Sequence, residues 1–315
     1  MKRLCFFLLL LLTLSQCKKS DTTEATNTIF DFPVNTSLMP DTVKDLDNGG
    51  TGDGFIFSYD NLNRVTAVNY YEYFLDQALY NDRTSTFHYS GNDMLPASVD
   101  LVWTSSSASV NGKYKIYFFY NADKSKNRDS VIDLNDNTQN AVRKYTYDWA
   151  LNYAKTDYYK TGSTQISFTD SASFVNYNCV YYRSDRIKYS FGNPYIAESA
   201  IAQYVHDNRT NPLSGLNIFP ALFMNNCLFW GYHTDDIVAS PTVTLNFVSQ
   251  NNVRRSNCSH YGSGGPASWN PRYSRTAYDD TYDASNRLLK RKFQDSVLTP
   301  TYYPERYSLI YRYHN

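Results

Sequence analysis

The feature that most constrains the fold is a short recurring unit, in which an aromatic-rich segment runs into a polar turn and a second apolar segment leads out. Its two clearest copies are Tyr59–Val65 and Tyr282–Leu288, which share Tyr-Asp-x-x-Asn-Arg-aliphatic. An Asp that opens a turn can accept backbone N–H groups two residues on, and Asn tolerates the left-handed conformation. We therefore expect the shared residues of these two copies to form structural turns of β-hairpins and not catalytic sites. These residues are Tyr59, Asp60, Asn63, Arg64, Tyr282, Asp283, Asn286 and Arg287.

Weaker copies of the unit lie between these two. Aromatic segments that end at Tyr89, Tyr120 and Tyr147 each precede a polar turn, and Leu245–Phe247 precedes another. Many copies are separated by about 30 residues, which fits one hairpin and its return. The 30 Tyr and 18 Phe also favour a thin sheet with half-exposed rings over a thick aliphatic core. The pattern predicts a mainly β fold, an open, twisted antiparallel sheet of consecutive hairpins in a single domain over residues 50–315.

The two clear copies resemble YD repeats, the hairpin units of RHS-type proteins. The chain as a whole resembles Bacteroidota lipoproteins that carry a degenerate YD-like domain of unknown function, and the shared features include a central turn, here His206–Pro212. The resemblance implies a location in the cell envelope and brings no catalytic residues. It also implies that four residues of the central turn are structural, namely Asp207, Asn208, Asn211 and Pro212.

The N-terminus is typical of an exported protein. Lys2 and Arg3 precede the apolar run Leu4–Leu14, which is too short to cross a bilayer because a spanning helix needs about 20 apolar residues. Leu14-Ser15-Gln16-Cys17 resembles a lipobox, although Gln16 stands where a small residue is usual. We expect a signal peptide over 1–16, a lipid on Cys17, and a lipidated N-terminus with a polar tether over 17–49. The alternative is an ordinary cleaved signal with a coincidental cysteine. We expect an outer-membrane or cell-surface lipoprotein, with the leaflet left open.

One stretch interrupts the hairpin rhythm. Ile196–Val205 has helical spacing, and Leu213–Trp230 is strongly apolar with Pro220 near an expected helix start. We predict a small helical insertion around 196–230 that covers the sheet as a core plug. The alternative is a mobile lid or a partner-binding helix.

Three cysteines remain after Cys5 and Cys17. We expect Cys227 to be buried and reduced inside the apolar insertion. Cys179 and Cys258 are a candidate disulfide, since both lie near predicted strands and an exported chain meets an oxidising compartment. No C-x-x-C spacing is present, so we expect no zinc site.

Charge and motifs limit the function. Of 30 basic residues, Lys2 and Arg3 leave with the signal, so 28 face 30 acidic residues without a basic run, and no nucleic-acid partner is expected. The sequence contains no hydrolase, metalloprotease or phosphate-loop motif, so we expect no cofactor or metal and no catalytic residue, and an enzymatic role is disfavoured. His233–Asp236 is a weak metal candidate, and three tryptophans could stack on a sugar: Trp103, Trp149 and Trp269.

We favour a non-enzymatic binding or structural role with a glycan or protein ligand. The alternative is a secreted glycan-acting hydrolase, which needs two carboxyls roughly 5–10 Å apart.

Overall fold

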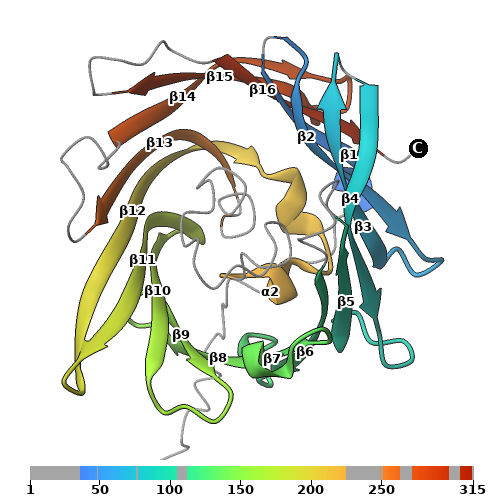
Figure 1. The fold of residues 1–315 in the computed structure, drawn as a ribbon. Helices are drawn as coiled ribbons and strands as arrows, with labels where there is room; N and C mark the ends of the chain where they lie inside the picture. Colours follow the sequence, from blue (N-terminus) through green and yellow to red (C-terminus); the bar gives the residue numbers. More distant parts are fainter. Residues whose placement is uncertain are drawn as a thin grey trace, which may run out of the picture.

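The computed structural model describes residues 36–47, 49–75, 77–104, 112–224, 249, 251–262, 272–297 and 306–313. Within them the chain forms sixteen strands, labelled in Figure 1. The strands are β1 (Pro40–Asp47), β2 (Gly52–Tyr59), β3 (Val65–Phe74), β4 (Gln77–His88), β5 (Ser98–Trp103), β6 (Gly112–Tyr120), β7 (Lys126–Asp133), β8 (Ala141–Asp148), β9 (Tyr153–Lys160), β10 (Ile166–Val175), β11 (Asn178–Ser190), β12 (Asn193–Thr210), β13 (Asn251–Gly262), β14 (Arg272–Tyr282), β15 (Leu288–Val297) and β16 (Arg306–Tyr313). Short 3-10 turns lie at η1 (Thr36–Leu38), η3 (Asn137–Gln139) and η4 (Pro212–Gly215), and α2 spans Phe219–Leu222.

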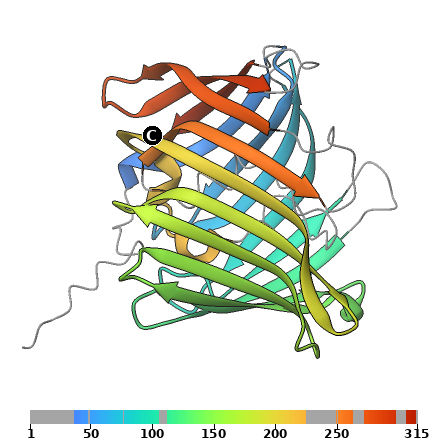
Figure 2. The ribbon, with the colours of Figure 1, turned by 90° about the vertical axis from the view of Figure 1, so that its left-hand side faces the viewer.

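The strands form a closed barrel. Each strand pairs antiparallel with the next one in the chain, and β1 pairs with β16, where Val43 lies opposite Tyr311. The strands run obliquely around the barrel (Figure 2). The predicted open sheet of YD-like hairpins is therefore wrong. Twist and tilt accumulate over the consecutive strands until the two edges meet, and closure pairs backbone groups that an open sheet would leave exposed.

The domain begins earlier along the chain than residue 50. Strand β1 lies within the stretch expected to be a tether, and it forms the seam with β16. Residues 1–35, including Cys17 and the predicted signal peptide, lie outside the described residues.

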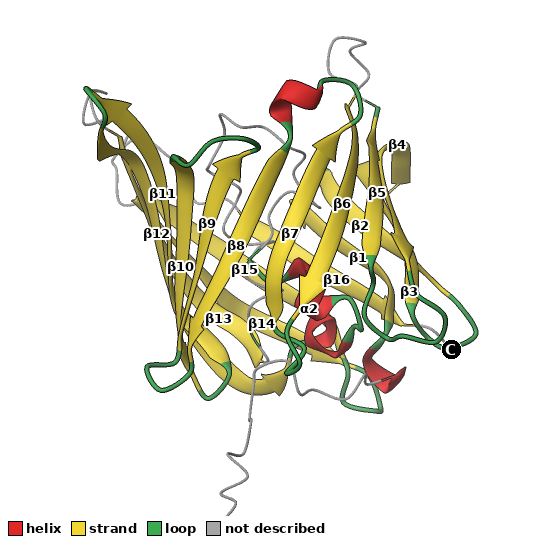
Figure 3. Ribbon diagram, turned by 90° about the horizontal axis from the view of Figure 1, so that it is seen from below, coloured by secondary structure: helices red, strands yellow, loops and turns green. Residues whose placement is uncertain are grey.

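The chain enters the barrel lumen after β12. Every residue from Asn211 to Met224 is buried, and we call this segment the plug. Its Leu216 and Ile218 share one apolar cluster with wall residues such as Val99 and Ile116. Figure 3 shows α2 inside the barrel toward one end, which we call the plug end. The turns that follow the even-numbered strands lie at this end, and β1 also starts there because Pro40 pairs with Tyr313.

The helical insertion around 196–230 was predicted incorrectly. Ile196–Val205 lies in β12, where it pairs with β11 on one side and β13 on the other. Pairing on both sides outweighs the helical spacing of its apolar residues. The α-helix is the single turn Phe219–Leu222, with Pro220 in its first turn as expected. Residues 225–248, including Cys227, lie outside the described residues. No helix in the described part of the chain is long and apolar enough to cross a membrane.

Candidate functional site

Five tyrosines form a partial girdle at the plug end, along the half of the rim that runs from β16 through β2, β4 and β6 to β8. Each tyrosine lies at or next to the end of an even-numbered strand, and its hydroxyl donates to a backbone carbonyl at or near the start of the preceding strand. The five bonds are Tyr59 to Pro40 (2.7 Å), Tyr89 to Val65 (2.6 Å), Tyr120 to Pro96 (3.0 Å), Tyr147 to Lys126 (2.9 Å) and Tyr313 to Leu288 (2.7 Å). Burial raises the pKa of Tyr89 to about 12, so the hydroxyl stays protonated and able to donate. The regular spacing of these tyrosines was visible in the sequence, but their contacts across neighbouring hairpins were not.

The predicted turn residues lie at the same end. Asp60 accepts from the backbone N–H groups of Leu62 and Arg64, both at 2.9 Å, and from Arg64 Nε at 2.7 Å. Asp283 likewise accepts from the backbone N–H groups of Ser285 at 2.9 Å and Arg287 at 2.8 Å, and from Arg287 Nε at 2.6 Å. Asn63 and Asn286 have φ values of 59° and 62°, in the left-handed region. These contacts support a structural role for the turn residues.

The two turn arginines connect neighbouring hairpins. Arg64 lies over the ring of Tyr89 at 4.3 Å, and Arg287 lies over the ring of Tyr313 at 4.6 Å. Arg64 Nη1 also donates to the backbone carbonyls of Gly91 and Asp93, at 2.8 and 2.9 Å. Each arginine therefore joins its own turn to an adjacent part of the girdle.

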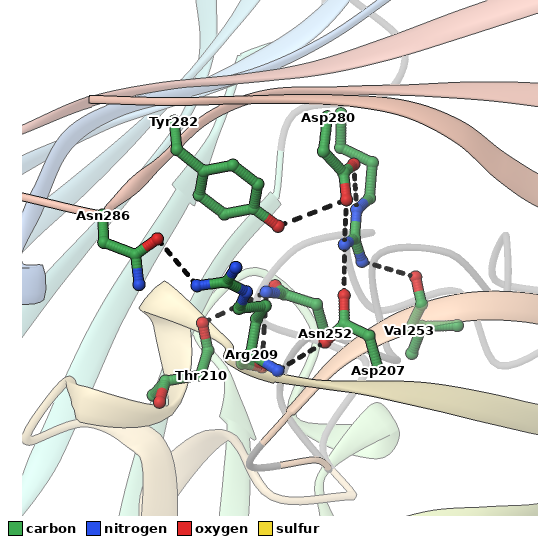
Figure 4. Close-up of polar contacts among 9 residues, drawn as sticks. Asp207, Arg209, Thr210, Asn252, Val253, Asp280, Tyr282 and Asn286 are labelled. Carbon is green, nitrogen blue, oxygen red and sulfur yellow. Dashed lines mark hydrogen bonds and ion pairs between the residues drawn. The ribbon is translucent and has the colours of Figure 1, made fainter. Parts of the chain in front are cut away.

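The segment expected to be the central turn continues β12 as far as Thr210. The Asp207 carboxylate accepts from the backbone N–H of Arg209 at 2.8 Å, and its second oxygen pairs with Arg291 from β15 (Figure 4). Arg291 is 2% exposed and also binds Asp280, through Nε at 2.8 Å and Nη2 at 2.7 Å, and Val253 O at 3.0 Å. Burial lowers the pKa of Arg291, but the hydrogen bonds to Asp280 and Asp207 outweigh it and raise the pKa overall. The sequence did not indicate Arg291 or Asp280, because their partners are distant in the chain.

The remaining residues of this segment lead into the plug. Asn208 is exposed, whereas Asn211 is buried. Asn211 caps η4 by accepting from Leu213 N at 3.1 Å, and it donates to Ser249 O at 3.0 Å. Pro212 follows at the start of η4, where a missing N–H costs nothing.

Two polar side chains attach the plug to the wall. Asn217 accepts from Val65 N at 2.9 Å and donates to Tyr89 Oη and Met94 O, both at 2.8 Å. Lys126, fully buried, donates to Ala221 O at 2.8 Å and lies 4.3 Å from the ring centre of Tyr145. These contacts attach the plug to the wall at α2 and at the link between η4 and α2.

Asp129 pairs with two buried cations beneath the plug. Its carboxylate lies 3.5 Å from Lys126 Nζ and accepts from Arg143 Nε at 3.0 Å and Tyr145 Oη at 2.7 Å. Burial of these charges is tolerated because each one has an oppositely charged or hydrogen-bonding partner.

Two pockets open at the plug end. The larger, of about 530 Å³, is lined by Asp93, Met94, Leu95, Pro96, Ala97, Phe118, Tyr120, Lys124, Ser214, Leu216, Asn217, Phe219 and Pro220. The smaller, of about 370 Å³, lies near the turn of β14 and β15 and includes Asn208, Arg209 and Asn286. Asp93 is the one carboxylate among the described residues lining the two pockets, so they do not offer the carboxylate pair that glycoside hydrolysis needs.

His206 and Ser249 superficially resemble a catalytic dyad. His206 Nε2 lies 2.9 Å from Ser249 Oγ, but Ser249 is fully buried and also accepts from Cys179 N at 3.1 Å. Burial lowers the pKa of His206 to about 4. A hydroxyl enclosed in this way cannot reach a substrate, so we assign the contact to packing.

The remaining candidates are dispersed. Cys179 is a buried free thiol on β11, and β12 separates it from Cys258 on β13. Strands two positions apart lie about 10 Å from each other, beyond disulfide reach, so the arrangement disfavours that predicted bond. Trp103 contacts Arg83, and Trp149 stacks on Tyr147. Trp269 and His233–Asp236 lie outside the described residues, within which no group of metal-ligating side chains is found.

The outer wall carries charges near the middle of its strands. Cross-strand register places Arg128, Lys144, Asp157, Thr169, Asp185 and Ser199 in one outward row from β7 to β12. Ion pairs along the wall include Lys115 with Asp100 at 3.4 Å, Lys155 with Asp157 at 2.8 Å and Arg183 with Asp185 at 2.8 Å. On the inner wall, an apolar cluster packs against the plug beside the buried charges of Lys126 and Asp129.

Comparisons with known proteins give structural similarity alone. No family model matches the chain, and no curated protein matches it. A porin-like protein from Bacteroides uniformis ATCC 8492 is 8% identical with a TM-score of 0.47, over 87% of this chain and 98% of that chain. A porin-like protein from Bacteroides vulgatus ATCC 8482 is 10% identical with a TM-score of 0.45, over 88% of this chain and 98% of that chain.

Proposed function

We propose that this chain is an exported envelope protein, held at the outer membrane or cell surface by a lipid on Cys17, with a non-enzymatic binding or structural role. In this proposal the lipid attaches the protein to the membrane and the barrel wall stands in water. The observation that carries it is the outer wall, where charged side chains occupy the middle of the strands.

A bilayer around the barrel would contact the charged side chains of the outer wall. A membrane barrel presents an outward apolar band about 25 Å tall, and a Lys or Arg at its midplane costs about 2–4 kcal/mol. Lys144, Lys155 and Arg183 lie near the middle of β8, β9 and β11 and point outward. Several such costs would add up around the barrel. In water, Lys155 and Arg183 form ordinary surface ion pairs with Asp157 and Asp185, and Lys144 lies over the ring of Tyr159.

Labelling and fractionation test both parts of the proposal. Wild-type protein should incorporate a fatty-acid label and fractionate with membranes, whereas Cys17→Ala should be unlabelled and released in soluble form. Cys5→Ala is the matched control, since this cysteine lies within the predicted signal, and it should behave like the wild type.

The two possible failures are distinguishable. Equal labelling of wild type and Cys17→Ala would refute lipidation at this residue. An unlabelled Cys17→Ala protein that still resists extraction from membranes would refute a water-exposed wall and point to a barrel embedded in the bilayer.

A further inference from the structure

The larger pocket at the plug end has an apolar interior built from two sources. The plug contributes Leu216 and Phe219, both buried, and β6 contributes Phe118. Met94 lies at the rim and is 39% exposed, so an apolar surface reaches the pocket mouth. A volume of about 530 Å³ is within the range of small-molecule sites, which are mostly apolar with a few polar groups.

Two exposed side chains of opposite charge line the pocket. Lys124 comes from the turn between β6 and β7, and Asp93 comes from the connection between β4 and β5. Among the described residues, neither side chain forms an ion pair or a hydrogen bond. Arg64 binds the backbone carbonyl of Asp93 and leaves its carboxylate open.

Lys124 has an unusual backbone conformation for a lysine. Its φ is 66°, in the left-handed region that is costly for most residues and tolerated by Asn. The equivalent turn positions in two other hairpins are Asn63 and Asn286. A lysine therefore replaces asparagine at this turn position, and it brings an ammonium group to the pocket.

We propose that this pocket binds a zwitterionic amphiphile, an alkyl chain whose head group carries both a phosphate and an ammonium. The chain would lie against Phe118, Leu216 and Phe219. The phosphate would contact Lys124, and the ammonium would contact Asp93. A purely anionic or cationic head group satisfies one of these charges and leaves the other facing a like charge. The site does not depend on lipidation of Cys17.

The test uses the full chain carrying Cys17→Ala, so that no protein-bound lipid competes. Calorimetric titration below the micelle concentration compares dodecylphosphocholine with three head-group controls of the same chain length: dodecanoate, dodecyltrimethylammonium and dodecyl maltoside. We expect saturable binding of one equivalent, with dodecylphosphocholine the tightest. Equal affinity for all four would overturn the head-group assignment, and no saturable binding would overturn the site.

Two charge variants separate the contacts. Lys124→Asn keeps the turn, since Asn accepts its conformation, and should weaken dodecylphosphocholine binding about three- to tenfold. The same change should leave dodecyltrimethylammonium binding unchanged or tighter. Asp93→Asn should also weaken dodecylphosphocholine binding, but should tighten dodecanoate binding.

Two further variants complete the set. Lys160→Asn removes an exposed lysine at the opposite end of the barrel and should change nothing. Ala97→Phe fills the pocket and should abolish binding of every ligand, while the thermal midpoint confirms folding. Unchanged dodecylphosphocholine affinity in both Lys124→Asn and Asp93→Asn, or retained binding in folded Ala97→Phe, would refute the proposal.

Discussion

At the scale of single residues, the most informative groups are the acids that open the turns. Asp60 and Asp283 each bind two backbone N–H groups and one arginine within their own hairpin, although they lie in widely separated parts of the chain. Each carboxylate has its acceptor sites directed at its own turn. This geometry favours stability of the turn over chemistry with a ligand.

Asp283→Ala should lower the thermal midpoint by a few degrees at neutral pH, and Asp283→Asn should have a smaller effect because its amide oxygen still accepts. Hydrogen bonds from the Arg287 backbone and side chain lower the pKa of Asp283 from its usual 3.8. A carboxyl whose pKa is lower in the folded state than in the unfolded state stabilises folding at pH values above its unfolded pKa. That stabilisation is lost as the pH falls through its folded-state pKa. The difference between wild type and Asp283→Ala should therefore shrink below about pH 4, as measured by thermal unfolding. A difference that persists at pH 2 would contradict the turn assignment.

His206 should make folding stability depend on pH in a different window. Its pKa falls from 6.5 to about 4 because burial disfavours the charged ring. The unfolded chain therefore binds a proton that the folded chain refuses, and stability drops as pH falls from 6.5 to about 4. Urea unfolding at pH 7 and pH 5 should show this loss in wild type and a smaller loss in His206→Asn, which cannot take up the proton. Equal losses would show that His206 is not the responsible group.

At the scale of elements, the plug depends on polar contacts as much as on its apolar side chains. Its turns leave backbone groups that the lumen cannot hydrate, and the wall supplies partners such as Lys126 for Ala221 O. In return, Asn217 satisfies Val65 N at the point where β3 begins. The plug and the wall therefore complete each other's hydrogen bonds.

Asn217→Ala should destabilise the protein by about 1–3 kcal/mol, because it leaves the buried Val65 N without this partner and removes the bond to Met94 O. Asn217→Asp should be milder at Val65, since it keeps the acceptor. Hydrogen exchange should show faster exchange of the Val65 amide in Asn217→Ala, and chemical denaturation should measure the loss. Asn208→Ala, at an exposed site, is the control and should leave both quantities unchanged.

At the scale of the whole molecule, closure between β1 and β16 decides the architecture. Thr42 and Arg312 face each other across this seam. Residues directly opposite in antiparallel strands have Cα atoms about 4.5–5.5 Å apart, within the range of about 4.4–6.8 Å that a disulfide spans.

Thr42→Cys with Arg312→Cys should therefore form an intramolecular disulfide on mild oxidation, visible as a mobility shift that reductant reverses. The control pair Thr42→Cys with Ser171→Cys places the second thiol on β10, across the barrel, and should not cross-link within one molecule. Failure of the first pair while the protein remains folded would contradict the closed seam.

Local features could be predicted from the sequence because their causes are local. Aromatic-rich segments indicated strands, and the Tyr-Asp-x-x-Asn-Arg units marked hairpin turns whose bonds lie within five residues. The position of Pro220 in the first turn of a helix could be predicted because its fixed φ suits that position. The apolar character of the plug likewise showed that it would leave water.

The tertiary structure decided everything that depends on residues distant in the chain. Closure could not be predicted, since an open sheet and a barrel share the same hairpins and differ in the tilt and stagger summed over sixteen strands. Ile196–Val205 became strand because two neighbours supplied hydrogen bonds that helical spacing could not reveal. Arg291, the tyrosine girdle and the larger pocket exist only once the barrel brings separate hairpins together around the plug.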